Sequence, residues 1–221
     1  QKASHWPKLV SLLEAHRISL VFDVGANVGQ YAERLIEHGY RGRMVSFEPQ
    51  STAHATLVAR AAGQAGWEVA PRAAVGARPG EIEINVSAES DMSSALAMTE
   101  ESQRHFASAR TIATECAPVV TLADEIARRA APDDRVFVKS DTQGFEHEVL
   151  DGLGASISRV VGLQLELALH PVYAGQKRYL EMLTRIDELG FAPYLVIPGY
   201  WSRHHGRMLE IDVVAFREAA S

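Results

Sequence analysis

This chain of 221 residues has little of what marks secreted, membrane-spanning or nucleic-acid-binding proteins. Its single cysteine, Cys116, forbids an intramolecular disulfide and is typical of a reducing compartment. No stretch approaches the roughly 20 apolar residues of a membrane helix. The apolar run at 9–13 is too short and too polar for a secretory signal. We therefore expect a cytoplasmic protein without a membrane span.

The chain also has no excess of positive charge. Its formal net charge is −6, and only four of its 22 basic residues are lysines. A nucleic-acid backbone is therefore not the expected partner. With 47% apolar and 23% charged residues, the composition is that of an ordinary globular protein. Its length predicts a single domain over residues 1–221.

Short apolar runs alternate with segments of helical periodicity, which predicts an α/β fold. This alternation is typical of a doubly wound, mostly parallel sheet covered on both faces. Two final strands without a helix between them predict an antiparallel hairpin at one edge. The expected strands cover 20–24, 44–47, 67–75, 81–86, 135–139, 160–167, 194–197 and 209–216, and the clearest expected helices cover 51–62 and 179–189.

Two segments stand outside this alternation. Residues 1–17 carry apolar side chains at helical spacing and predict a helix packed beside the sheet. Residues 87–116 show no period, apart from a short helix expected at 100–109. Long irregular segments in compact domains are usually functional or mobile. We expect 87–116, with the N-terminal helix, to form a lid over the acceptor, although a plain surface excursion is the alternative.

The segment from Asp23 to Gly29 is a glycine-containing turn between a strand and a helix. Its spacing matches the Asp-x-Gly-x-(Gly/Asn)-x-Gly loop that holds S-adenosylmethionine (SAM), whereas a dinucleotide fingerprint would need glycine in place of Asn27 and Gln30. Glu48 ends the next strand, where an acidic side chain can accept both ribose hydroxyls. A merely tight turn, or an NAD site, is the alternative interpretation.

Two carboxylates end later strands of the predicted sheet. In an open parallel sheet, ligands bind outside the carboxyl ends of the strands. Asp141 and Glu166 are therefore candidates for a general base or for Mg²⁺ ligands near the reacting methyl group. Alternatively, Asp141 caps a helix, or the pair neutralises Lys139, which needs a buried partner.

Histidines are weaker candidates. His170 follows Glu166 closely and is a reserve base, and His147 could face the same crevice. The adjacent pair at 204–205 fits a solvated turn, and no His/Cys spacing resembles a zinc site. Asp124, after Thr121, is interpreted as part of a helix cap.

Taken together, these motifs resemble the FkbM family of SAM-dependent methyltransferases over nearly the whole chain. The residues that carry the resemblance are 23–31 (DVGANVGQY), 47–49 (FEP), 120–124 (VTLAD), 139–146 (KSDTQGFE), 150–152 (LDG), 164–166 (QLE), 171–173 (PVY), 206–207 (GR) and 212–214 (DVV). The chain departs from the family pattern at Ser140, where an apolar residue is more usual.

The resemblance implies a class I methyltransferase fold of seven strands, the last one antiparallel. It also implies O-methylation of a hydroxyl on a small acceptor, usually a sugar or polyketide. By analogy, Asp141 lies beside the methyl donor and Glu166 at the acceptor side. The expected cofactor-binding residues are Asp23, Gly25, Ala26, Asn27, Gly29, Tyr31, Glu48, Ala74 and Asp141.

Other interpretations remain beside this one. They are a non-catalytic binding module on the same fold, an NAD-dependent oxidoreductase and an RNA methyltransferase. The basic stripe that an RNA enzyme would need is absent from the sequence. A second copy of the chain is a further candidate partner.

Overall fold

The computed structural model describes residues 4–88, 92–106 and 110–218. None of the helices within these ranges is long and apolar enough to span a membrane. The helices are α1 (Trp6–Ala15), α2 (Gln30–Glu37), α3 (Ser51–Ala61), α4 (Glu100–His105), α5 (Leu122–Arg129), α6 (Glu146–Asp151), the 3₁₀-helix Gly154–Arg159 and α7 (Tyr179–Glu188). The strands are β1 (Leu20–Val24), β2 (Arg43–Phe47), β3 (Trp67–Val69), β4 (Ala74–Val75), β5 (Gly80–Ser87), β6 (Thr111–Val120), β7 (Val136–Ser140), β8 (Val160–Ala168), β9 (Phe191–Pro198), β10 (Trp201–Ser202), β11 (Arg207–Met208) and β12 (Glu210–Arg217).

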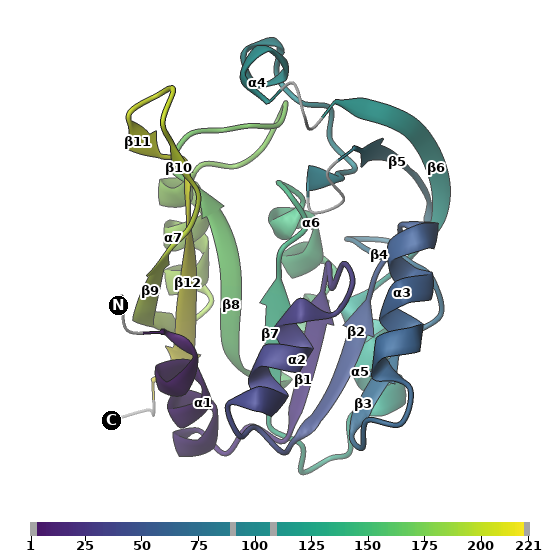
Figure 1. Ribbon diagram of the computed structural model, residues 1–221. Coiled ribbons are helices and arrows are strands. Elements are labelled where there is room, and N and C mark those ends of the chain that lie inside the picture. Colours follow the sequence, from purple (N-terminus) through teal and green to yellow (C-terminus); the bar gives the residue numbers. More distant parts are fainter. Residues whose placement is uncertain (1–3, 89–91, 107–109, 219–221) are drawn as a thin grey trace.

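Seven strands form the main sheet in the order β3-β2-β1-β7-β8-β12-β9. Along this order, the first five strands (β3, β2, β1, β7 and β8) pair in parallel (Figure 1). Strand β12 pairs antiparallel with both β8 and β9. This arrangement confirms the predicted doubly wound sheet with an antiparallel last strand. The register places Asp23 of β1 opposite Lys139 of β7.

Each face of the main sheet packs against its own set of helices. Along β1, Leu20 and Phe22 belong to a core cluster shared with α5, α6 and α7. Val21 points to the other face and belongs to a cluster shared with α1, α2 and α3. Side chains of a strand alternate between faces, and a sheet buried on both faces therefore favours apolar residues at most positions of its strands. This preference explains the short, mostly apolar runs in the sequence.

A second sheet of three strands, β4-β6-β5, stands beside the main one. It corrects two expectations. Residues 67–75 form two short strands in different sheets, because β3 pairs with β2 whereas β4 pairs with β6. Part of the expected irregular segment 87–116 belongs to a regular element, because β6 begins at Thr111 and pairs with β5 along its length.

The remaining parts of the expected lid lie in different places. The short helix is present as α4, while residues 107–109 lie outside the described residues. In Figure 1, α4 stands above the upper end of the main sheet. By contrast, α1 packs through Leu9 and Leu13 against the sheet, near Phe216 of β12. None of the residues of α1 lines the pocket described below, and the expected place of this helix in a lid over the acceptor stays a prediction.

Candidate active site

The turn between β1 and α2 is shaped by residues with positive φ. Gly25 has φ +70°, and a Cβ there would lie 1.8 Å from the carbonyl oxygen of Asp141. Asn27 also has a positive φ of 48°, a conformation that asparagine tolerates better than most residues. The turn therefore passes directly against the end of β7, which brings the candidate SAM loop and Asp141 together.

Lys139 lies beneath this turn and joins it to the sheet. Its Nζ is 3.0 Å from Oδ1 of Asp23, and it donates a hydrogen bond of 3.0 Å to the carbonyl of Gly25. Burial lowers the pKa of Lys139, but the charges of Asp23 and Asp141 outweigh it and raise the value to about 12. The main partner of Lys139 is therefore Asp23, the residue opposite it in register. Asp141, one of the partners expected from the sequence, lies farther away at 4.0 Å.

Glu48 ends β2 with its carboxylate turned toward the turn. Its two oxygens accept hydrogen bonds of 2.8 Å from the backbone N–H groups of Asn27 and Gln50. The residue is 7% exposed. Burial raises the pKa of Glu48 to about 7, although the two N–H donors lower it. The carboxylate is thus held in one orientation at the wall of a pocket.

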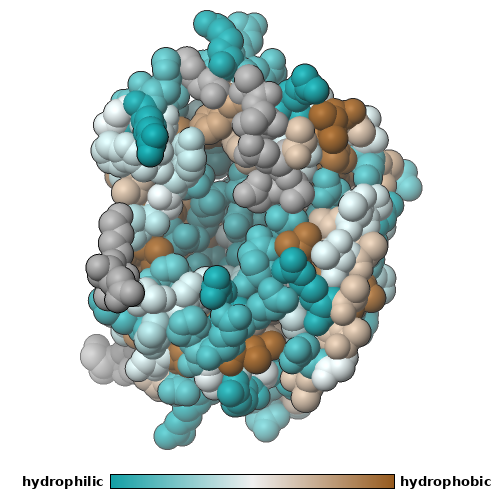
Figure 2. Space-filling model, viewed as in Figure 1, coloured by the Kyte–Doolittle hydropathy of each residue, from teal (hydrophilic) through white to brown (hydrophobic). Residues whose placement is uncertain are grey.

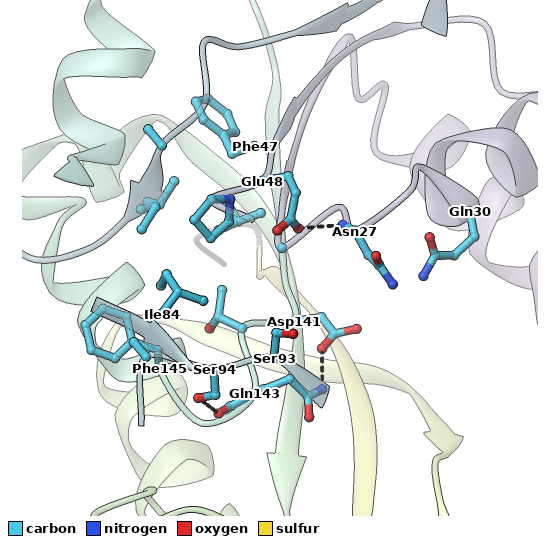
Figure 3. A pocket seen from close by; sticks show the side chains of 18 residues that line it. Asn27, Gln30, Phe47, Glu48, Ile84, Ser93, Ser94, Asp141, Gln143 and Phe145 are labelled. Atoms are coloured by element: carbon cyan, nitrogen blue, oxygen red, sulfur yellow. Dashed lines mark hydrogen bonds between the residues drawn. The ribbon is translucent and has the colours of Figure 1, made fainter. Parts of the chain in front are cut away.

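That pocket has a volume of about 690 Å³, which includes the solvent-filled space at its mouth. Figure 2 shows the molecule hollowed near the middle of the face displayed. Apolar walls come from Phe47, Ile84 and Phe145, and polar groups come from Asn27, Glu48 and Asp141 (Figure 3). A mostly apolar cleft with a few convergent polar groups is the usual form of a small-molecule site.

Asn27 gives a test of whether the pocket suits SAM. Its side-chain oxygen is buried and accepts no hydrogen bond from the described residues. Such a group is costly unless a ligand supplies a donor. SAM carries an amino group and ribose hydroxyls that can donate to Asn27 and Glu48, and an adenine that suits the apolar walls. The residues present therefore fit this cofactor.

Gln143 bridges the two candidate catalytic carboxylates. Its side-chain amide donates hydrogen bonds of 2.9 Å to Oδ1 of Asp141 and to Oε2 of Glu166. The amide oxygen accepts a bond of 3.0 Å from the hydroxyl of Tyr173, and Ser94 donates to the backbone carbonyl of Gln143. Gln143 has φ +54°, so these contacts hold a strained backbone conformation. Strain of this kind is common at functional sites.

Several acidic side chains gather at this end of the sheet. Burial and then the charge of Asp141 raise the pKa of Glu166 well above its ordinary value. For the same two reasons the pKa of Glu210 is raised to about 7 and that of Asp212 to about 6. Asp212 lies opposite Glu166 in register, on the neighbouring strand. Burial and mutual charge therefore favour the protonated forms of these carboxyls.

Asp141 does not have the helix-capping role considered for it. The helix α6 begins at Glu146, whose carboxylate accepts from the backbone N–H groups of Thr142 and Gly144. Asp141 therefore does not cap that helix. Its side chain is 37% exposed and lines the pocket. The expected cap at Thr121 is present, because its hydroxyl accepts from the N–H of Asp124.

The other predicted site residues divide into two groups. Gly25, Asn27, Glu48, Ala74 and Asp141 line the pocket. The rest of the expected cofactor set lies behind it: Asp23 under the turn, Ala26 and Gly29 in its buried part, and Tyr31 with its hydroxyl donating to Gln164.

The histidines lie elsewhere. His147 pairs with Glu148 and does not line the pocket. His170 lies near Glu101 and His205. Its role as a base stays a prediction. The sequence interpretation missed Gln143 and Tyr173. The signal that could have pointed to Gln143 was its place within the motif at 139–146.

The fold is that of SAM-dependent methyltransferases. Magnesium protoporphyrin IX methyltransferase from Synechocystis PCC 6803 with bound SAM is 12% identical, over 96% of this chain and 77% of that one, with a TM-score of 0.52. A Streptococcus pneumoniae protein in complex with SAM, described as a candidate tRNA (m1A22) methyltransferase, is 11% identical, over 97% of this chain and 74% of that one, with a TM-score of 0.50. An uncharacterized protein from Listeria monocytogenes serotype 4b is 9% identical, over 100% of this chain and 70% of that one, with a TM-score of 0.53.

The family follows from the sequence match. Residues 23–193 match the model of the methyltransferase FkbM domain. The chain therefore belongs to the FkbM methyltransferase family, and its cofactor is SAM. No curated protein matches the chain significantly.

Proposed function

We propose that this protein transfers the methyl group of SAM to a hydroxyl oxygen of a small, hydroxyl-rich acceptor that contains a sugar. The observation that carries the proposal is the bridged pair Asp141–Gln143–Glu166 beside the cofactor pocket. An alcohol is a weak nucleophile and needs a base, or a metal ion, to take its proton during attack. Paired carboxyls, of which Asp141 lines the pocket, meet this need.

Each residue then has a role in the transfer. When bound, SAM supplies a methyl group made electrophilic by its sulfonium sulfur. The carboxylate of Asp141 would accept the proton of the acceptor hydroxyl as the acceptor oxygen takes the methyl group. Glu166, whose pKa is raised by burial, orients the acceptor through a hydrogen bond, and Gln143 holds both carboxyls in place. Because the site holds the acceptor and the methyl donor close together, the reaction needs little catalysis beyond this proton transfer.

The cofactor roles follow from the pocket. Glu48 accepts hydrogen bonds from the ribose hydroxyls, and the side-chain oxygen of Asn27 accepts one from the amino group of SAM. Gly25 permits close approach of the backbone at the turn. The structural neighbours are named for a porphyrin and a tRNA, and the fold therefore does not choose the acceptor. The net charge of −6 favours a small molecule over RNA.

The test is methyl transfer from labelled SAM to a panel of free sugars, sugar nucleotides and glycosylated metabolites. We expect Asp141→Asn and Glu166→Gln to lower kcat about a hundredfold or more, and to leave the Kd for S-adenosylhomocysteine (SAH) almost unchanged. Glu148→Gln, on the neighbouring helix, is the matched control and should keep its turnover. A parallel series with EDTA tests the alternative that Asp141 and Glu166 bind Mg²⁺. Full turnover in both carboxylate variants would refute the proposal.

A further inference from the structure

Three segments far apart in the sequence meet at the end of the main sheet where α4 stands (Figure 1). They are residues 92–106, the loop after β8 at 169–175, and the turn region at 199–209. Backbone hydrogen bonds join them, from Thr99 N–H to the carbonyl of Val172 and from Leu169 N–H to that of Leu209. Beneath these bonds lies a small apolar cluster of Val172, Tyr173 and Leu209, with Met92, Leu96, Met98 and Phe106 packed against it.

At the edge of this junction each segment contributes one side chain able to ligate a metal. Glu101 comes from α4, His170 from the loop after β8 and His205 from the turn between β10 and β11. Nε2 of His170 lies 3.9 Å from Oε2 of Glu101, and Nε2 of His205 lies 3.5 Å from Oε1. One ligand atom from each residue lies within 4.8 Å of the others. Within the described ranges, no other group of three such residues is found this close together.

His205 is oriented by a neighbour in the way that metal-binding histidines are. Its Nδ1 lies 2.8 Å from the hydroxyl of Ser202, and its backbone N–H donates to the same hydroxyl. A hydrogen bond at one ring nitrogen fixes the orientation of the imidazole and leaves the other nitrogen directed at the metal. Here the directed atom is Nε2, the atom that faces Glu101. The side chain of His205 is only 14% exposed.

We propose that Glu101, His170 and His205 form a binding site for a divalent transition-metal ion, with Zn²⁺ as the favoured ion. Two imidazole nitrogens and one carboxylate oxygen suit Zn²⁺, whereas Mg²⁺ and Ca²⁺ prefer oxygen ligands only. Zinc bonds of about 2.0–2.1 Å place tetrahedral ligands roughly 3.3 Å apart. The ligand atoms of Glu101 and the two histidines now lie 3.5–3.9 Å apart, slightly more than this. Glu101 can move closer, because its side chain is 56% exposed and can change rotamer.

Bound metal would connect α4 to both loops at the end of the main sheet. This junction also supplies Tyr173, whose hydroxyl donates to Gln143. The ion would thus stiffen the segments beside the candidate acceptor site, and three protein ligands leave one coordination position for water or for an acceptor oxygen. The site is distinct from the Asp141–Glu166 pair, and its existence does not depend on the proposed O-methylation.

The experiment is calorimetric titration of the EDTA-stripped and dialysed full chain with ZnCl₂. We expect one saturable ion per chain. Glu101→Gln, His170→Ala and His205→Ala should each weaken binding about tenfold or more. The matched control is His204→Ala, which removes the neighbouring exposed histidine of the same turn and should bind Zn²⁺ as the wild type does. Binding of SAH by each variant reports that the fold is retained.

A second measurement uses the wild type alone, so that it holds even where a variant fails to fold. The protein loaded with Co²⁺ should show the intense visible absorption of a four-coordinate site. Weak six-coordinate bands would overturn the proposal. So would Zn²⁺ binding weaker than about 100 µM, or binding that persists unchanged in all three ligand variants. In those cases the three residues are an ordinary surface ion-pair cluster.

Discussion

Replacing Lys139 by methionine tests the link between the sheet and the cofactor turn. The variant keeps most of the length of the side chain but leaves the carboxylate of Asp23, which is 0% exposed, without its cationic partner. Removing one member of a buried ion pair costs about 3–5 kcal/mol, because the remaining charge stays desolvated. For a chain of this size, each kcal/mol lowers Tm by about 2–4 °C. We therefore expect Tm to fall by about 6–20 °C.

The assay is urea unfolding of the wild type, Lys139→Met, Asp23→Asn and the double variant. The double variant removes both charges of this pair. The free energy of unfolding that it loses should therefore be smaller than the sum of the two single losses, by about 2 kcal/mol or more. Lys139→Met should also weaken SAH binding, since Nζ fixes the carbonyl of Gly25. The exposed pair Arg60–Glu33 gives the control, because Arg60→Met should cost below about 1 kcal/mol. A similarly small loss for Lys139→Met would show that Lys139 does not stabilise the buried carboxylate of Asp23.

Two further predictions concern the pocket. The pKa of Glu48 is raised to about 7, so its ionised fraction falls as pH drops from 8 to 6. Ribose hydroxyls donate most strongly to the ionised carboxylate of Glu48, so the Kd for SAH should rise up to about tenfold as pH drops over this range. In Glu48→Gln the Kd should not change with pH. A Kd of the wild type that does not change with pH would contradict this prediction. Gly25→Ala should abolish SAH binding, because its Cβ would collide with the carbonyl of Asp141, whereas Gly63→Ala, with φ +80° and open space, should only cost about 1 kcal/mol in urea unfolding. Equal effects of the two glycine variants would show that the collision is irrelevant.

The sequence predicts the main sheet well because its strands are buried on both faces. Such strands are short and mostly apolar, and β1, β7 and β8 stand out for this reason. The split at residues 67–75 could not be predicted, since nine residues also suit a single strand. Similarly, β6 is mostly exposed over its first six residues and lacks the alternation that marks a strand.

At the site, the residues in local motifs could be predicted, and the contacts between distant ones could not. Glu48 and Asp141 end strands, and strand ends of a parallel sheet meet at one edge. The partner of Lys139 depends on the register of β1 against β7, which no local pattern reveals. His170 and His205 come together with Glu101 only because β12 returns beside β8. Sequence spacing alone gives no zinc motif for such a group.

We propose that the pocket between Glu48 and Asp141 holds the methyl donor. Calorimetric titration of the wild type and of Glu48→Ala with SAH, with NAD in parallel, measures this binding. We expect the wild type to bind SAH with micromolar affinity and not NAD, and Glu48→Ala to lose SAH binding. Binding of NAD in place of SAH, or unchanged SAH binding in Glu48→Ala, would show that the methyl donor does not bind between these residues.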